Sequence, residues 1–141
     1  MLGFLEFSIL FISLNIIADL IHYKVRVVHG IDFLFFAPWL AGALYGLQQG
    51  IILAGILLAL HVVFNIDIAL YQVASFPSLA VAIFLGNNMG VRGFWVSLAA
   101  YLGVSSVIVL VLRGFGGRFL SFLLAALIFN FILLFTIPYL V

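Results

Sequence analysis

The sequence predicts an all-α fold, a polytopic transmembrane helical bundle of about six helices that forms a single integral membrane domain over residues 1–141. The chain holds only five Lys or Arg and four Asp or Glu residues, and 68% of its residues are apolar. Water-soluble domains carry about a quarter charged residues, so this chain has too few to cover a surface that faces water. Its continuous apolar runs, such as residues 51–60 and 119–134, favour helices over the alternating strands of a β-barrel.

The first helix is expected from about residue 2 to residue 22, because this apolar length approaches the roughly 20 residues needed to cross a bilayer. The segment has no basic start and no small-residue cleavage site, so we expect a retained helix rather than a signal peptide. A polar connection is expected over residues 23–30.

The second apolar block, residues 31–64, is too long for one span and slightly short for two. Its middle, residues 47–50, has the sequence Leu-Gln-Gln-Gly, which is typical of a tight turn. We therefore expect a short Gly-rich hairpin of two helices, each of about 15 residues, that spans only if the bilayer thins locally. A re-entrant hairpin is the alternative. Small residues recur at every fourth position at Gly42, Gly46 and Gly50, and Gly55 and Ala59 repeat this spacing, which predicts close helix packing.

The rest of the chain predicts three more helices, and Pro77 is expected to kink the first of them. These helices are expected over residues 68–86, 93–112 and 119–140, with turns at 65–67, 87–90 and 113–118. Six crossings would place the turns near residues 25, 66 and 115 on one face, and both termini on the other. Lys24, Arg26, Arg113 and Arg118 would lie on the first face and Arg92 on the second, which by the positive-inside rule places the first face in the cytoplasm.

The first candidate site is a row of polar residues on the first helix. Asn15, Asp19 and His22 are spaced by four and three residues, which places them on one helical face. Burying an ionisable residue in a membrane is costly, so Asp19 is a candidate to accept a proton or a cationic ligand, with His22 as its partner. The alternative is that Asp19 lies close enough to the helix end to reach water or to pair with Lys24 or Arg26.

The second candidate site lies at the end of the third helix, where His61 and Asn65 are four residues apart. In the expected topology these side chains arrive on the same face as Asp19, and together they would form a polar pocket for a small molecule. Ordinary interfacial residues are the alternative. A metal site is conceivable because His and Asp are common ligands, but no HExxH motif is present.

Further polar and aromatic side chains could line such a pocket. Ser75 and Ser78 flank Pro77, and their hydroxyls could satisfy carbonyls freed by the proline or contact a ligand. Trp39 follows a run of phenylalanines that reads first as an interfacial anchor and second as a ligand-stacking wall. The candidate ligand-binding residues are Asn15, Asp19, His22, Trp39, His61, Asn65, Tyr71 and Gln72.

No catalytic pattern accompanies these residues. The chain has no cysteine, no serine elbow, and no Walker or zincin motif, so we expect a non-enzyme with no cofactor and no metal. A formal charge of +1 gives no nucleic-acid footprint. The expected partners are the lipid bilayer, a small-molecule ligand, and other membrane subunits or further copies of the chain. The expected location is the cell membrane, as a multi-pass protein.

Three segments carry a family resemblance: DFLFFAPWLAGALYGLQQG from Asp32, ASFPSL from Ala74 and FLGN from Phe84. Together they resemble the S components of energy-coupling-factor vitamin transporters, over roughly residues 31–141. The resemblance implies six helices and a small-molecule pocket beneath outer loops, on the face that holds His22, His29, His61 and Asn65. It also implies an orientation opposite to the one that the charge count favours. The chain differs from the family in two respects. It is short, and its first helix lacks the A-x-x-x-A docking pattern.

A second resemblance rests on the run from Asp19 to His22 and on the Gly-rich second hairpin. These features are similar to the MreD family of cell-wall elongation scaffolds, which implies a non-catalytic assembly subunit without a ligand. The leading hypothesis is therefore a small S-component-like protein that binds and helps translocate a small molecule. A membrane scaffold is the alternative, and a proton- or cation-coupled carrier that uses Asp19 and His22 is the third.

Overall fold

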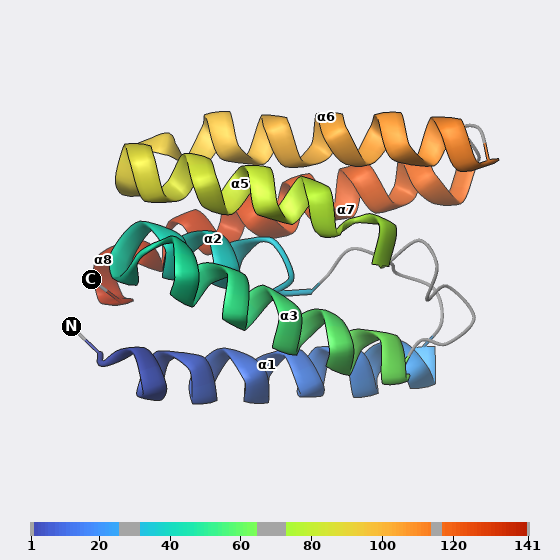
Figure 1. Cartoon of the computed structure of the whole chain (residues 1–141). Helices are drawn as coiled ribbons and strands as arrows, with labels where there is room; N and C mark the ends of the chain where they lie inside the picture. The colour runs from blue at the N-terminus through green and yellow to red at the C-terminus, as the bar shows by residue number, and fades with distance from the viewer. Residues whose placement is uncertain (1, 26–31, 65–72, 114–116, 141) are drawn as a thin grey trace.

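The computed structural model describes residues 2–25, 32–64, 73–113 and 117–140. Within these ranges the regular elements are all helices, and the predicted all-α bundle is confirmed (Figure 1). The elements are α1 (Phe4–Val25), α2 (Phe36–Tyr45), α3 (Leu47–Phe64), α5 (Phe76–Met89), the 3₁₀ helix η2 (Gly90–Gly93), α6 (Phe94–Arg113), α7 (Gly117–Leu134) and α8 (Ile137–Leu140).

The long helices run side by side along one common direction (Figure 1). One end of the bundle holds the start of α1, the turn between α2 and α3, η2 and α8. The other end holds the last turns of α1, α3 and α6 and the first turn of α7. This arrangement agrees with the two faces expected from the sequence. The short helix α2 lies inside the bundle, where it packs against α3 and α5.

The hairpin of α2 and α3 differs from the predicted one in where the chain turns. The chain reverses at Gly46, whose φ of 109° is accessible to glycine and strained for other residues. Residues 47–50, predicted as the turn, instead form the first turn of α3, because Leu and Gln are good helix formers once the glycine has reversed the chain. As a result α2 has 10 residues and α3 has 18, rather than two helices of equal length.

Small residues bring α2, α3 and α5 close together. A Cβ added at Gly42 would lie 2.8 Å from Ile83 Cγ2, and one at Gly50 would lie 2.9 Å from the Pro38 carbonyl oxygen. The predicted close packing is therefore confirmed at these two glycines. It is wrong at Gly55, which is exposed and would place a Cβ in open space.

Proline begins helices here rather than bending them. α5 starts at Phe76, so Pro77 lies in its first turn, where a backbone N–H has no helical partner to lose. Residues 73–74 are helical and a turn at Ser75 separates them from α5, so the predicted helix is interrupted just before Pro77 and does not continue through it. The Ser78 hydroxyl accepts a hydrogen bond of 2.9 Å from Ser105 Oγ in α6. The last predicted helix is interrupted at residues 135–136, and α8 follows with Pro138 in its first turn.

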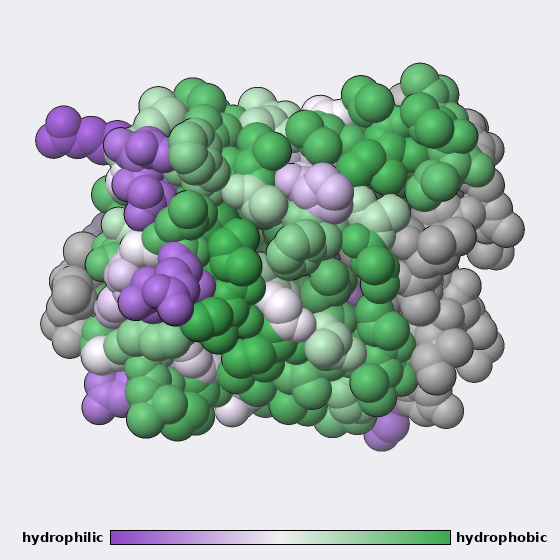
Figure 2. Space-filling model, viewed as in Figure 1, coloured by the Kyte–Doolittle hydropathy of each residue, from purple (hydrophilic) through white to green (hydrophobic). Residues whose placement is uncertain are grey.

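Among the described residues, three helical stretches are long and apolar enough to cross a membrane: Phe4–Ile21, Leu47–Phe64 and Phe76–Leu112. The last of these contains both α5 and α6, which fold back on each other at η2. The surface between the two ends is largely hydrophobic, while hydrophilic side chains gather at the end that holds η2 (Figure 2). Large apolar side chains such as Leu5, Ile17 and Val107 are more than half exposed, as expected of helices that face lipid.

Candidate functional site

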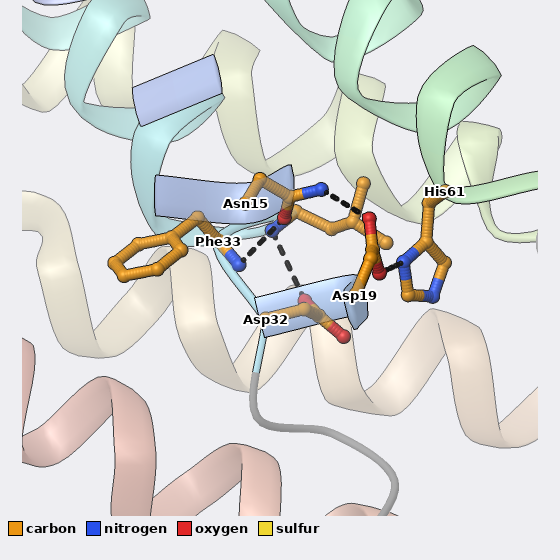
Figure 3. Close-up of polar contacts among 6 residues, drawn as sticks. Asn15, Asp19, Asp32, Phe33 and His61 are labelled. Carbon is orange, nitrogen blue, oxygen red and sulfur yellow. Dashed lines mark hydrogen bonds and ion pairs between the residues drawn. The ribbon is translucent and has the colours of Figure 1, made fainter. Parts of the chain in front are cut away.

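Four buried polar side chains come together from three parts of the chain (Figure 3). Asn15 and Asp19 lie one turn apart on α1, and both are fully buried. His61 lies near the end of α3 and Asp32 lies before the start of α2, and these two are 6% and 9% exposed. Buried polar groups in a bundle of this apolar composition require partners. Asn15, Asp19 and His61 bond to one another, and Asp32 accepts from a backbone N–H.

Their contacts form a chain that joins α1 to two other elements. The Phe33 backbone N–H donates to Asn15 Oδ1 over 3.2 Å. Asn15 Nδ2 donates to Asp19 Oδ2 over 2.9 Å, and Asp19 Oδ1 contacts His61 Nδ1 as a hydrogen-bonded pair (Figure 3). Asn15 therefore bridges the segment before α2 and the Asp19–His61 pair.

The depth of these contacts follows from the length of α1. Its 22 residues extend about 33 Å at 1.5 Å per residue, close to the thickness of a hydrocarbon core. Asn15 is near the middle of this helix, so Phe33 is held near mid-depth of the bundle. The 10 residues of α2 then cover about 15 Å, from mid-depth to one end only. Residues 32–35 are thus non-helical backbone in the interior of the bundle.

Non-helical backbone at membrane depth needs hydrogen-bond partners within the protein. The Asn15 side chain supplies one of them, and Asp32 Oδ1 supplies another by accepting the Leu34 N–H over 3.0 Å. The carbonyl of Phe33 accepts from Ala37 N over 3.1 Å, which begins the backbone ladder of α2. The polar side chains of the site therefore also satisfy the backbone N–H groups that precede α2.

Asp32 was absent from the candidate site residues, although a signal for it exists. An Asp just before an apolar run is a common helix-start signal, and here it precedes α2 by four residues. Its carboxylate lies within electrostatic range of His61 and of the buried Tyr101 on α6. Two carboxylates thus act on one imidazole in the interior.

The interpretation of Asp19 as a residue that reaches water is wrong. α1 continues beyond it to Val25, and Asp19 is fully buried with Asn15 and His61 as partners. Lys24, one of the two cations considered as a partner for Asp19, is exposed, and the other, Arg26, lies outside the described residues.

Trp39 lies in an aromatic core. Its ring packs 5.1 Å from that of Phe94 and stacks with that of Phe35 at 6.1 Å, and Gly86 lets it approach the backbone of α5. The indole is fully buried, and Nε1 has no hydrogen-bond partner among the described atoms. The predicted role of Trp39 in ligand stacking remains a prediction.

The other candidates fall largely outside the described residues. Asn65, Tyr71 and Gln72 lie in the segment 65–72, and Arg26 lies in the segment 26–31. The backbone of His22 belongs to α1, but its side chain lies outside the described part of the structure. Within the part of the chain that is described, no group of three or more His, Cys, Asp or Glu residues could hold a metal ion.

An Asp–His pair of this kind can hold, accept or release a proton, and its oxygens and nitrogens can orient a polar ligand. A scan of family models and searches among curated proteins and solved structures give no match to this chain. The residues themselves therefore carry the functional argument.

Proposed function

We propose that this chain is a multi-pass protein of the cell membrane that binds a small molecule and helps to move it across the bilayer, without a catalytic step. One observation carries the proposal: the buried Asp19–His61 pair lies next to the non-helical start of α2. The resemblance to the substrate-capture S components agrees with this function.

Two physical arguments support a binding role over a purely structural one. An ionisable pair inside a membrane is expensive to desolvate, and such residues usually mark ligand or ion pathways. Discontinuous helices whose ends lie near the midplane are also typical of the binding sites of transporters. Both features meet at Asn15, whose amide contacts Asp19 on one side and Phe33 on the other.

In this proposal Asp19 and His61 orient the ligand by hydrogen bonds. Asn15, His22, Asn65, Tyr71 and Gln72 are proposed to complete the polar lining. Trp39 and the neighbouring aromatic rings would supply apolar walls, which most small-molecule sites combine with a few placed polar groups.

The test is ligand-induced stabilisation of the purified chain in detergent, with a panel of vitamins and small amines. A true ligand should raise the unfolding temperature of the wild type, because it binds the folded state alone. The variant Asp19→Asn should lose that shift, whereas Ser13→Ala, an exposed change on the same helix, should keep it. A folded wild type that responds to no compound would contradict the proposal.

A second function, a non-catalytic assembly subunit, is favoured by the outer face of α7. Large apolar side chains are exposed along this helix, at Leu120, Leu124, Leu127, Ile128, Phe131 and Ile132. Such a face suits a partner helix as well as lipid. Crosslinking in native membranes from residues of α7 distinguishes the two: a specific protein partner supports the assembly role, and lipid-only surroundings contradict it.

A further inference from the structure

The contact between His61 and Asp19 constrains where protons can be. Two lone pairs facing each other would repel, so a hydrogen must lie between His61 Nδ1 and Asp19 Oδ1. If the imidazole is neutral, the pair carries the charge of the carboxylate. If the imidazole takes a second proton, the pair becomes a neutral ion pair.

Further titratable groups lie near the pair. Asp32, from the segment before α2, adds a second carboxylate within electrostatic range of His61, and Tyr101 on α6 adds a phenol near Asp32. α5 contains no titratable residue, and on α2 the one such residue is Tyr45 at its far end. α7 contains Arg118, whose side chain lies outside the described part of the structure. Of the described Lys and Arg side chains, Lys24 and Arg92 are both exposed. Among the described side chains, the pair therefore faces one further carboxylate, Asp32, and no buried Lys or Arg.

We propose that the Asp19–His61 pair is a proton-binding site and that Asn15 transmits its protonation to the start of α2. The inference deepens the proposed function, on which it rests, because it names the proton as the ligand that controls the same site. The proton comes from water, binds to the pair and returns to water, and no other group is consumed.

The transmission follows from the two-sided hydrogen bonding of Asn15. Its NH₂ group must face an acceptor, and Asp19 Oδ2 holds it in the orientation that turns Oδ1 toward the Phe33 N–H. Protonation draws the charge of Asp19 toward the imidazolium, or neutralises the carboxylate directly. Either change weakens Asp19 as an acceptor for Asn15, because charge-assisted hydrogen bonds are about twice as strong as neutral ones. The Phe33 N–H is then held less firmly.

As a result, the strength of the hydrogen bond between the Phe33 N–H and Asn15 depends on protonation of the pair. This hydrogen bond is stronger when the pair is deprotonated and weaker when it is protonated, so it strengthens as pH rises. The segment just before α2 would respond, because side chains accept the hydrogen bonds of the Phe33 and Leu34 N–H groups there.

The experiment is hydrogen–deuterium exchange of the Phe33 and Leu34 amides in the full chain in lipid nanodiscs, between pH 5 and pH 9. Rates are corrected for the intrinsic pH dependence of exchange. Protection of Phe33 should fall by about tenfold as pH decreases, along a single-proton curve. Imidazole ¹⁵N shifts of His61, identified by the signal that His61→Gln lacks, should titrate with the same midpoint.

Matched variants separate the steps. His61→Gln can still donate to Asp19 but cannot titrate, so protection should become independent of pH. Asn15→Leu should remove protection at every pH while His61 still titrates, and Ser13→Ala should behave as the wild type. Flat wild-type protection, or a His61→Gln variant with an unchanged titration, would overturn the proposal. If a variant does not fold, unequal midpoints of the wild-type exchange and ¹⁵N curves would overturn it as well.

No small-molecule ligand is used in these measurements, so the outcome is independent of the ligand screen. A protein that binds a ligand but shows no titration at Phe33 keeps the proposed function and loses this inference. A protein that titrates at Phe33 but binds no compound keeps the proton site and loses the transport function.

Discussion

Asn15 is the residue on which the interior polar network depends, because its amide group is used on both sides. It accepts from the Phe33 N–H and donates to Asp19, and the residue is fully buried. The spacing of Asn15 and Asp19 on one face could be predicted from the sequence. The pairing of Asp19 with His61 could not, because it depends on how α1 and α3 pack.

Replacing Asn15 with Leu should destabilise the protein by about 1–3 kcal/mol, because the buried Phe33 N–H would lose its partner. Urea or thermal unfolding in detergent measures this change. Ser13→Leu on the exposed side of the same helix is the control and should change the free energy of unfolding by less than about 0.5 kcal/mol. Equal effects of the two substitutions would mean that the Asn15 contact is not important for stability.

Replacing Gly46 with Ala should cost about 1–3 kcal/mol, because an alanine cannot adopt a φ of 109° without strain. The turn between α2 and α3 would then distort. Gly103→Ala is the matched control, since its Cβ would meet no atom within 4 Å. Thermal unfolding of both variants measures the difference. A Gly46→Ala variant with an unchanged unfolding temperature would contradict a turn at Gly46.

Among the elements, α2 shows best what the sequence could and could not predict. Its apolar composition and a reversal near residue 47 were evident, and both were predicted. Its short length was not, because residues 32–35 are kept out of the helix by Asn15 and Asp32. The same holds for Pro77, whose position at a helix start rather than inside a helix was not distinguishable by local composition.

The packing of α2 on α5 predicts a strong effect at Gly86. A Cβ there would lie 2.8 Å from Trp39 Cδ1 and 2.9 Å from the Trp39 carbonyl oxygen, so the two helices would have to separate. Gly86→Ala should destabilise the fold by about 1–3 kcal/mol. Gly55→Ala, which meets no atom, should be neutral or stabilising by up to about 1 kcal/mol. Similar unfolding temperatures for the two variants would contradict the observed packing.

For the whole molecule, composition alone predicted the bundle of helices and its apolar surface. The paucity of charge is a property of the entire chain, so it does not depend on any single contact. Which helix ends lie together follows from the alternation of spans, and the structure agrees. The chemical identity of the ligand could not be predicted from the sequence. Which polar side chains would face it depends on how the helices pack, and the sequence alone does not determine that packing.

The membrane topology can be tested directly because the chain contains no cysteine. Single cysteines at Gln48, Asn88 and Lys24 replace exposed residues at the two ends of the bundle. In intact proteoliposomes, an impermeant maleimide should label Gln48→Cys and Asn88→Cys from the same side and Lys24→Cys from the other. Labelling of all three from one side would contradict a bundle that spans the bilayer.

The most direct test of the account is a double-mutant cycle on Asp19 and His61, measured by unfolding in lipid bicelles. Each single substitution, Asp19→Leu or His61→Leu, leaves a buried partner without this hydrogen bond, and the second substitution then has little left to remove. The account predicts a coupling free energy of at least about 1.5 kcal/mol between the two positions. Additivity to within about 0.5 kcal/mol would show that the two side chains do not form the buried pair at the centre of this protein.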